Sequence, residues 1–228
     1  MCRYNLTVWR KEKLNDQFLS EKNRCVIISG SPRFWVGEIK NTDYIIACDS
    51  GYRHAQKANI IPDLVVGDFD SYYGQIPKGI EVYAAPREKD DTDTMLAVKL
   101  AFKKGMTDIL LLGATGGRID HQLANVATAA YIAEHGGRCL IADYHNEIYA
   151  LKNSKVTIEK RTSWAASVLS FSDECKGVSY SGLKYNLTDA TLCNTFPLGV
   201  SNEIIADEAT VEVREGILLV ILSSLNAD

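Results

Sequence analysis

The aspartates between residues 63 and 93 are the side chains whose spacing in this chain best suits chemistry. Asp68 and Asp70 follow a glycine that ends the apolar run Leu64–Val66. Residues two apart in an extended chain point to the same side, so these like charges repel each other unless a cation lies between them. About 20 residues later, at a predicted helix start, come Asp90, Asp91 and Asp93.

These carboxylates have two interpretations. Aspartate is common in turns and at helix starts, and each one alone could have that structural role. A set of oxygen ligands without Cys or His suits a hard cation such as Mg²⁺, which usually shares its ligands with substrate phosphates. We therefore predict a magnesium site at Asp68, Asp70, Asp90 and Asp93, with catalytic roles for Asp68, Asp70 and Asp93.

The segment Gly113–His121, which follows the apolar run Ile109–Leu112, predicts a binding site for anions. A glycine pair beside a helix start can expose backbone N–H groups, and Arg118 can hold a phosphate with two donors. The alternative is a glycine-rich turn with a surface arginine. His121 could donate to a phosphate or a purine, or be a half-buried helix residue. The residues expected to contact the anion are Thr115, Gly116, Gly117, Arg118 and His121.

Apolar runs alternate with amphipathic stretches over residues 25–143. We predict strands at 25–29, 44–48, 64–66, 81–84, 109–112 and 139–142, and helices at 52–58, at 93–104 and from the glycine-rich loop to about 134. This order is typical of an α/β fold with a doubly wound, mainly parallel (Rossmann-like) sheet and helices on both faces. Such folds bind ligands at the carboxyl ends of their strands. Polar clusters follow four of the strands, at 29–31, 49–51, 67–71 and 113–121.

The pattern changes after about residue 143, where helical periodicity gives way to short segments that alternate with period two. We predict strands at 147–151, 156–159, 166–171, 177–181, 191–193, 203–206, 210–214 and 217–222. Closely spaced short strands are typical of an all-β sandwich or barrel. The predicted organisation is a polar N-terminal extension (1–24), an α/β domain (25–143) and a β-sandwich domain (144–228).

Composition excludes several classes of protein. The net charge of −4 gives no reason to expect a nucleic-acid partner. No apolar run approaches the ~20 residues that span a bilayer, and the polar N-terminus has no apolar signal core, so we expect a cytoplasmic protein without a membrane partner. The six cysteines form no Cys-x-x-Cys pair, and Cys25, Cys48 and Cys139 lie in apolar runs. We expect reduced thiols rather than a disulfide framework.

Five motifs, in order along the chain, resemble the thiamine pyrophosphokinase family. They are Gly-Asp-Phe-Asp-Ser at 67–71, Asp-Thr-Asp at 91–93, the Gly-Ala-Thr-Gly-Gly-Arg-Ile-Asp-His loop at 113–121, Gly-Leu-Lys-Tyr-Asn-Leu at 182–187 and Ser-Asn at 201–202. The resemblance runs from about Cys25 to the last predicted strand, and residues 1–24 fall outside it.

The resemblance implies pyrophosphoryl transfer from ATP to thiamine with Mg²⁺, in a homodimer with sites near the subunit interface. Carboxylates that hold a metal and donors that hold phosphates are what this class of transfer requires. The residues that the resemblance adds are Asp49, Ser71 and Lys89 for ATP, and Thr92, Ser201 and Asn202 for thiamine. The hydroxyl and amide of Ser201 and Asn202 could read the aminopyrimidine edge, although Ser-Asn also suits an ordinary turn.

One departure concerns the aromatic wall of the thiamine site. Eukaryotic members of the family place a C-terminal tryptophan against the thiamine ring, and this chain has none after Trp164. Tyr185, Phe196 or Trp164 is left to supply that surface. The alternatives are a related pyrophosphokinase acting on another alcohol, such as a hydroxymethyl pterin, and a nucleotide sensor without turnover.

Overall fold

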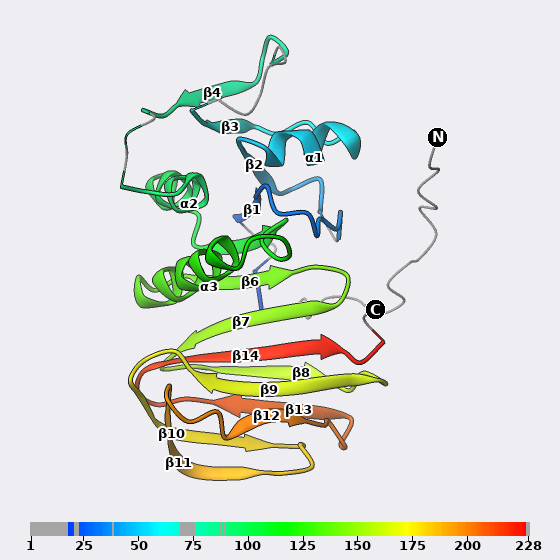
Figure 1. Ribbon diagram of the computed structural model, residues 1–228, viewed down its shortest axis with the longest axis vertical. Helices are drawn as coiled ribbons and strands as arrows, with labels where there is room; N and C mark the ends of the chain where they lie inside the picture. Colours follow the sequence, from blue (N-terminus) through cyan, green and yellow to red (C-terminus); the bar gives the residue numbers. More distant parts are fainter. Residues whose placement is uncertain are drawn as a thin grey trace.

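The computed structural model describes residues 18–20, 23–37, 39–68, 76–86, 88 and 90–226. In this part of the chain, a ten-stranded sheet and a four-stranded sheet are accompanied by three helices (Figure 1). The order in the larger sheet is β12-β9-β14-β7-β6-β5-β1-β2-β3-β4, and in the smaller β11-β10-β13-β8. The prediction of an α/β half followed by an all-β half is confirmed.

The first half alternates strands and helices as the sequence predicted. Its strands are β1 (Arg24–Ile28), β2 (Tyr44–Cys48), β3 (Leu64–Gly67), β4 (Glu81–Ala84), β5 (Asp108–Leu112) and β6 (Arg138–Ala142). Its helices are α1 (Gly51–Lys57), α2 (Asp93–Lys103) and α3 (Ile119–Glu134). All six strands pair in parallel, so their carboxyl ends meet at one edge of the sheet.

The second half consists of antiparallel strands. They are β7 (Asn146–Lys152), β8 (Lys155–Glu159), β9 (Trp164–Ser170), β10 (Glu174–Ser181), β11 (Leu187–Cys193), β12 (Gly199–Asn202), β13 (Glu208–Glu212) and β14 (Ile217–Ser224). Four of these, β7, β14, β9 and β12, extend the larger sheet, because β7 pairs antiparallel with β6. The predicted boundary at 143/144 therefore lies in a turn within one continuous sheet, and the sandwich shares that sheet with the α/β half.

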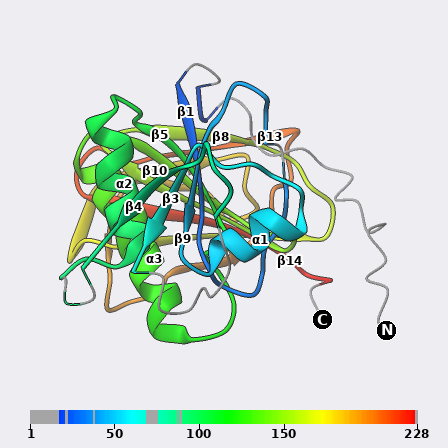
Figure 2. The same ribbon diagram turned by 90° about the horizontal axis from the view of Figure 1, so that it is seen from above.

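Alternation along each strand divides the core between the two faces of the larger sheet. Cys25 and Ile27 face a cluster built with α2 and α3, whereas Val26 and Ile28 face a cluster that includes α1 and the smaller sheet. Seen from above, α1 lies on the opposite side of the strands from α2 and α3 (Figure 2). Helices therefore cover both faces of the parallel part of the sheet, as the sequence predicted.

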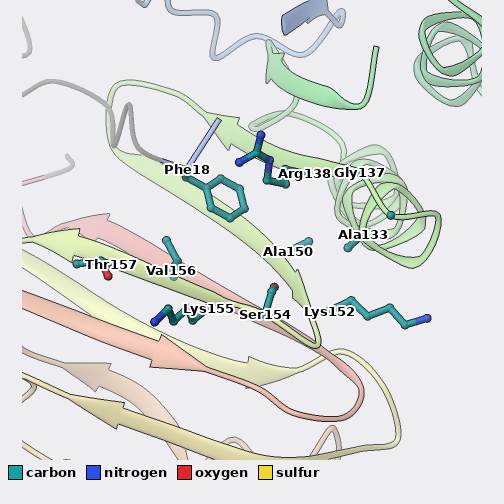
Figure 3. A pocket seen from close by; sticks show the side chains of 11 residues that line it. Phe18, Ala133, Gly137, Arg138, Ala150, Lys152, Ser154, Lys155, Val156 and Thr157 are labelled. Carbon is teal, nitrogen blue, oxygen red and sulfur yellow. The ribbon is translucent and has the colours of Figure 1, made fainter. Parts of the chain in front are cut away.

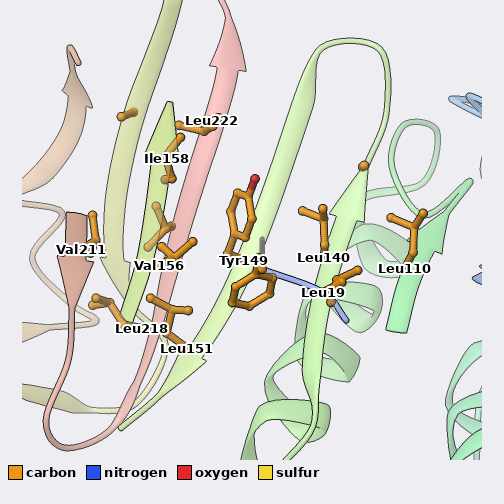
Figure 4. Close-up of a cluster of buried hydrophobic side chains, with 14 of the residues drawn as sticks. Leu19, Leu110, Leu140, Tyr149, Leu151, Val156, Ile158, Val211, Leu218 and Leu222 are labelled. Carbon is orange, nitrogen blue, oxygen red and sulfur yellow. The ribbon is translucent and has the colours of Figure 1, made fainter. Parts of the chain in front are cut away.

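The space between the two sheets is filled by apolar side chains around Tyr149 (Figure 4). The ring of Phe18 packs edge-on against Tyr149, with the ring centroids 5.1 Å apart. Phe18 and Leu19 are 7% and 5% exposed and belong to this core. The sequence assigned both residues to a polar extension, because two apolar residues in a charged segment give no periodic signal.

A pocket of about 350 Å³ lies where the end of α3 meets β7 and β8, with Phe18 at its side (Figure 3). Three basic side chains line it, from Arg138, Lys152 and Lys155, and two of them are engaged in ion pairs. Arg138 lies 2.6 Å from Asp108, and Lys152 lies 2.5 Å from Glu134. Two of the three charges are compensated in this way, and we assign no ligand to this pocket.

One predicted strand is wrong. Residues 203–206 were expected to form a strand, and the strand lies instead at β12, just before them. Ile204 makes only an isolated bridge to Leu183, and Ser201 has a φ of 59°, in the left-handed region. A residue in that region interrupts a regular ladder, and the pairing of β12 with β9 shifts register between Gly199 and Asn202.

Four cysteines are buried with free thiols: Cys25, Cys48, Cys139 and Cys175. Burial raises the pKa of Cys25 and Cys139 far above the ordinary range of a thiol. For these positions, the prediction of reduced core cysteines is confirmed. Among the residues described, no helix is both long and apolar enough to cross a bilayer.

Candidate active site

A cleft of about 700 Å³ opens at the carboxyl ends of the parallel strands. It lies where the strand order changes direction, because β1 has β2 on one side and β5 on the other. The chain passes from β1 toward β2 and from β5 toward β6, in opposite directions. A crevice therefore remains between the loops that follow β1 and β5. The volume is within the range of small-molecule sites. Lining residues come from the ends of β1, β2 and β3, from the loop after β5 and from the starts of α2 and α3.

Three carboxylates that the sequence singled out line this cleft: Asp49, Asp68 and Asp93. Asp49 follows β2 and has a φ of 31°. A non-glycine residue in this region is uncommon and is often found at functional sites. An added Cβ at Gly67 would lie 3.0 Å from the Cβ of Asp49, so the glycine lets the ends of β2 and β3 approach closely.

The helix start that carries Asp93 is fixed by local contacts. Thr92 is the N-cap of α2, and its hydroxyl accepts a hydrogen bond from the Met95 backbone N–H at 3.1 Å. Thr94 and Ser29, both buried, share a hydrogen bond of 2.9 Å that joins the helix to the end of β1. Thr92 lines the cleft, but the structure gives its hydroxyl a capping role.

The predicted metal ligands Asp70 and Asp90, and the polar residues near them in the sequence, are placed differently. Asp90 is exposed and does not line the cleft. Asp91 pairs with Lys99 on the side of α2, at 2.7 Å. Asp70, Ser71 and Lys89 lie outside the described residues. Within the described ranges, no group of three or more potential metal-ligating side chains is close enough to form a preassembled metal site.

The loop after β5 presents backbone N–H groups to the cleft. Gly116 and Gly117 line it and have φ angles of 82° and 71°, a conformation that glycine adopts without strain. Within the described residues, the N–H groups of Gly116, Gly117 and Arg118 have no hydrogen-bond acceptor. Adjacent free N–H groups ahead of a helix start form an anion-binding arrangement.

Arg118 stands at the mouth of this arrangement and is held by Asp120. Its Nε lies 3.1 Å and its Nη2 2.5 Å from the two oxygens of Asp120. These hydrogen bonds are the main reason why the pKa of Asp120 is lowered and the pKa of Arg118 is raised. The Arg118 side chain remains 73% exposed, so an incoming anion can reach it. His121 also lines the cleft and is exposed rather than half-buried.

The segment after β1 also lines the cleft and lies beside the loop after β5. Ser31 donates its backbone N–H to the carbonyl of Gly113 at 2.8 Å, which joins this segment to the loop after β5. The Nε2 of His54 lies 3.0 Å from the carbonyl oxygen of Ser31, and the ring stacks on Phe34. Since a carbonyl only accepts, Nε2 is the donor. Burial lowers the pKa of His54, which favours this neutral ring.

Comparison with known proteins assigns both halves of the chain. The thiamin pyrophosphokinase catalytic domain matches residues 37–141, and the thiamin pyrophosphokinase vitamin B1 binding domain matches residues 153–218. The thiamine pyrophosphokinase of Bacillus subtilis is 31% identical over 212 residues, covering 87% of this chain and 97% of that protein. The chain belongs to the thiamin pyrophosphokinase family.

Solved structures of the family have the same fold. The thiamine pyrophosphokinase of Bacillus subtilis superposes with a TM-score of 0.80 at 30% identity, over 88% of this chain and 99% of that one. The thiamin pyrophosphokinase of Geobacillus thermodenitrificans gives 0.77 at 27% identity, over 90% and 99% of the two chains. That of Candida albicans, at 18% identity and 0.66 over 88% and 90%, shares the fold.

The charges in the cleft of this family member indicate what it can bind. Four carboxylates and one guanidinium line it, from Asp49, Asp68, Asp93, Asp120 and Arg118. A polyphosphate alone would be repelled by this excess of negative charge. A divalent cation between carboxylates and phosphate removes the repulsion, and carboxylate oxygens are its preferred ligands. The donor set therefore fits Mg²⁺ bound together with a nucleotide.

Two of the three thiamine residues expected from the family resemblance, Ser201 and Asn202, lie far from this cleft within one chain. Ser201 and Asn202 belong to β12, the edge strand at the other end of the larger sheet (Figure 1). Six strand spacings separate β12 from β1, a distance of about 29 Å. The structure thus brings five ATP candidates, Asp49, Gly116, Gly117, Arg118 and His121, to one cleft together with Thr92, and leaves Ser201 and Asn202 apart from them.

Asn202 is also occupied by the protein. Its Oδ1 accepts from the backbone N–H of Tyr185 at 3.1 Å and of Glu203 at 2.9 Å, and its Nδ2 donates to the Tyr185 carbonyl at 2.7 Å. Only one N–H of the amide is left for a ligand. Its first role is to fix the backbone of Tyr185, whose ring is 66% exposed.

Two polar residues of α3 that line the cleft were not predicted as site residues. Asp120 orients Arg118, as described above. Asn125 lines the cleft, is 5% exposed and donates from Nδ2 to the carbonyl of Ala114 at 2.8 Å. The available signal was a polar residue on the buried face of α3, four residues before Ala129 and seven before Ile132.

Proposed function

We propose that this chain transfers the pyrophosphoryl group of ATP to the hydroxyl of thiamine, giving thiamine diphosphate and AMP. One observation carries the proposal: the glycine loop after β5 and the carboxylates of Asp68 and Asp93 line one cleft at the strand-order reversal. The match of residues 153–218 to a vitamin B1 binding domain favours thiamine over a pterin alcohol.

The chain's own residues divide the work of phosphate binding. The N–H groups of Gly116 and Gly117 hold phosphate oxygens, and Arg118 exchanges part of its contact with Asp120 for the nucleotide. Asp49 and His121 line the same cleft and complete the ATP site. Asp68 and Asp93, with Asp70, would hold a Mg²⁺ ion, which would supply neutralisation of the charge on the phosphates.

The reaction itself is an exchange of one P–O bond for another. The hydroxyl oxygen of thiamine bonds to the β-phosphorus while the bond from that phosphorus to the oxygen shared with the α-phosphate breaks. AMP leaves with the bonding electron pair, and the hydroxyl proton is released. The protein contributes orientation of the two substrates and stabilisation of the charge that builds on the phosphates.

We further propose that the acceptor site is completed by a second subunit. The candidate thiamine residues Ser201 and Asn202 of one chain lie about 29 Å from its own cleft, as estimated from strand spacing. A homodimer can place β12 and Tyr185 of one subunit beside the cleft of the other. Tyr185, presented by Asn202, would then be the aromatic wall for the thiazolium cation.

The basic test of the function measures AMP formation from ATP with and without thiamine. Thiamine-dependent AMP and an equal amount of thiamine diphosphate are expected. AMP formation that depends on a hydroxymethyl pterin instead would establish the related pyrophosphokinase. ATP binding without turnover on any acceptor would establish a sensor.

Arg118→Ala is expected to weaken MgATP binding about tenfold, because a charge-assisted hydrogen bond to phosphate is lost. The melting temperature should change little, since the side chain is 73% exposed. Calorimetric titration with MgATP is the measurement. Arg214→Ala, which removes an equally exposed arginine paired with Asp189 in the second half, is the matched control. Unchanged affinity and turnover for Arg118→Ala would make Arg118 an ordinary surface residue.

Asn202→Ala is expected to raise the KM for thiamine by roughly tenfold and the KM for ATP by less than about twofold. The lost hydrogen bonds release the backbone of Tyr185, a cost of ~1–3 kcal/mol for a buried polar group. Tyr185→Ala should reproduce the thiamine effect, and Tyr185→Phe should not, if the ring surface matters. Equal changes in both KM values would place the thiamine pocket elsewhere.

A shared site also predicts complementation between two impaired variants, assayed at thiamine concentrations well below the KM. Asp68→Asn and Asn202→Ala subunits, mixed and reassociated, form heterodimers with one intact site and one doubly altered site. An equal mixture should then recover up to about a quarter of the wild-type rate. Recovery no greater than the sum of the separate variants would place each complete site within one chain.

A further inference from the structure

Thr115 lies in the middle of the anion loop but does not line the cleft. Its side chain is 9% exposed, and its hydroxyl donates to Oδ2 of Asp143, which is fully buried. The expectation that Thr115 contacts ATP came from its place in the motif. The contacts instead direct its hydroxyl to a carboxylate behind the loop.

Asp143 is itself held firmly by the turn between β6 and β7. Its Oδ1 accepts the backbone N–H of His145 at 2.6 Å and of Asn146 at 2.9 Å, and the amide of Asn146 contacts both of its oxygens. A further hydrogen bond connects this turn to β14, because the Ser223 hydroxyl donates to Oδ1 of Asn146 at 2.9 Å. The carboxylate is therefore a fixed point connected to the second half of the chain.

The remaining contacts of the loop hold its backbone carbonyls. Asn125 binds the carbonyl of Ala114, and the Arg33 N–H binds that of Thr115 at 3.3 Å. Asp143 instead binds a side chain of the loop, that of Thr115, which lies one residue before Gly116. A hydrogen bond to a buried carboxylate is stronger and more directional than one to a neutral acceptor. It therefore restricts the rotation of the peptide groups that follow.

We propose that Asp143 is a positioning residue for phosphate binding, which acts through the Thr115 hydroxyl to fix the N–H groups of Gly116 and Gly117. The inference rests on the proposed ATP site. Asp143 lies between the two matched segments, which end at 141 and begin at 153, and so belongs to neither domain description. It makes the nucleotide loop dependent on the turn that joins the two halves.

Two variants of Thr115 form the first test. Thr115→Val keeps the shape and removes the hydroxyl, and should weaken MgATP binding about tenfold. Thr115→Ser keeps the hydroxyl and should bind within about twofold of wild type. Kinetic assays should show a raised KM for ATP with little change in the KM for thiamine. Calorimetry with MgATP alone and melting temperatures complete the measurement.

A double variant tests whether Asp143 acts through Thr115. Asp143→Asn should weaken MgATP binding in the wild-type background and add little in the Thr115→Val background. If the fold-losses in MgATP affinity of the two single variants multiply in the double variant, the two residues act independently and the inference is overturned. If Asp143→Asn does not fold, the Thr115 pair decides the question.

The outcomes separate this inference from the proposed function. Wild-type protein that binds no MgATP would overturn both. Wild-type binding with unchanged binding by Thr115→Val would overturn the positioning role alone. Equal losses for Thr115→Val and Thr115→Ser would also overturn it, because the hydroxyl would then not be the group that matters.

Discussion

Asp68→Asn is expected to lower kcat/KM at least a hundredfold, which corresponds to a loss of about 3 kcal/mol of transition-state stabilisation. The substitution keeps the shape of the side chain and removes a charge that we assign to the magnesium–phosphate contact. The same loss is expected for Asp93→Asn, and for Asp70→Asn, whose position lies outside the described residues. Steady-state assays with saturating Mg²⁺ are the measurement.

The stability of these variants provides an independent readout. Asp49, Asp68 and Asp93 line one cleft, so removing one charge relieves repulsion in the protein without ligands. The melting temperature without nucleotide should stay the same or rise. Asp207→Asn, on an exposed turn of the second half, is the control with normal turnover. Near-normal turnover for Asp68→Asn would make Asp68 a turn residue, the structural alternative considered from the sequence.

Arg161→Ala is expected to destabilise the fold by ~3–5 kcal/mol, because it leaves the buried carboxylate of Glu147 without its cation. The two side chains are 5% and 0% exposed and lie 2.8 Å apart. Glu147 also accepts from the hydroxyl of Tyr149 at 2.5 Å. Glu147 is on β7 in the larger sheet, and Arg161 follows β8 in the smaller one, so the pair connects the two sheets.

Urea unfolding measures this effect against two comparisons. Arg214→Ala breaks an exposed pair with Asp189 and should cost less than about 1 kcal/mol. Arg161→Met combined with Glu147→Gln removes both charges and should recover much of the stability lost in Arg161→Ala. A loss below about 1 kcal/mol for Arg161→Ala would show that solvent reaches Glu147.

The sequence alone determined the local elements and the convergence of the ATP candidates. Period-two and period-3.6 patterns are local properties, so strands such as β2 and helices such as α2 followed from the residues themselves. Parallel strands place their carboxyl ends at one edge. For that reason Asp68, Asp93 and the Gly116–Arg118 segment, far apart in the sequence, were expected in one cleft, where the structure places them.

Only the tertiary structure decided which strands are neighbours and which polar side chains form hydrogen bonds with distant residues of the chain. The antiparallel pairing of β6 with β7, which makes one sheet of the two halves, depends on contacts that no local pattern encodes. The burial of Phe18 depends on the space between two sheets. Asn202 and Asp143 have their partners in distant segments, Tyr185 and Thr115, and a hydrogen bond between such segments exists only once the chain has folded.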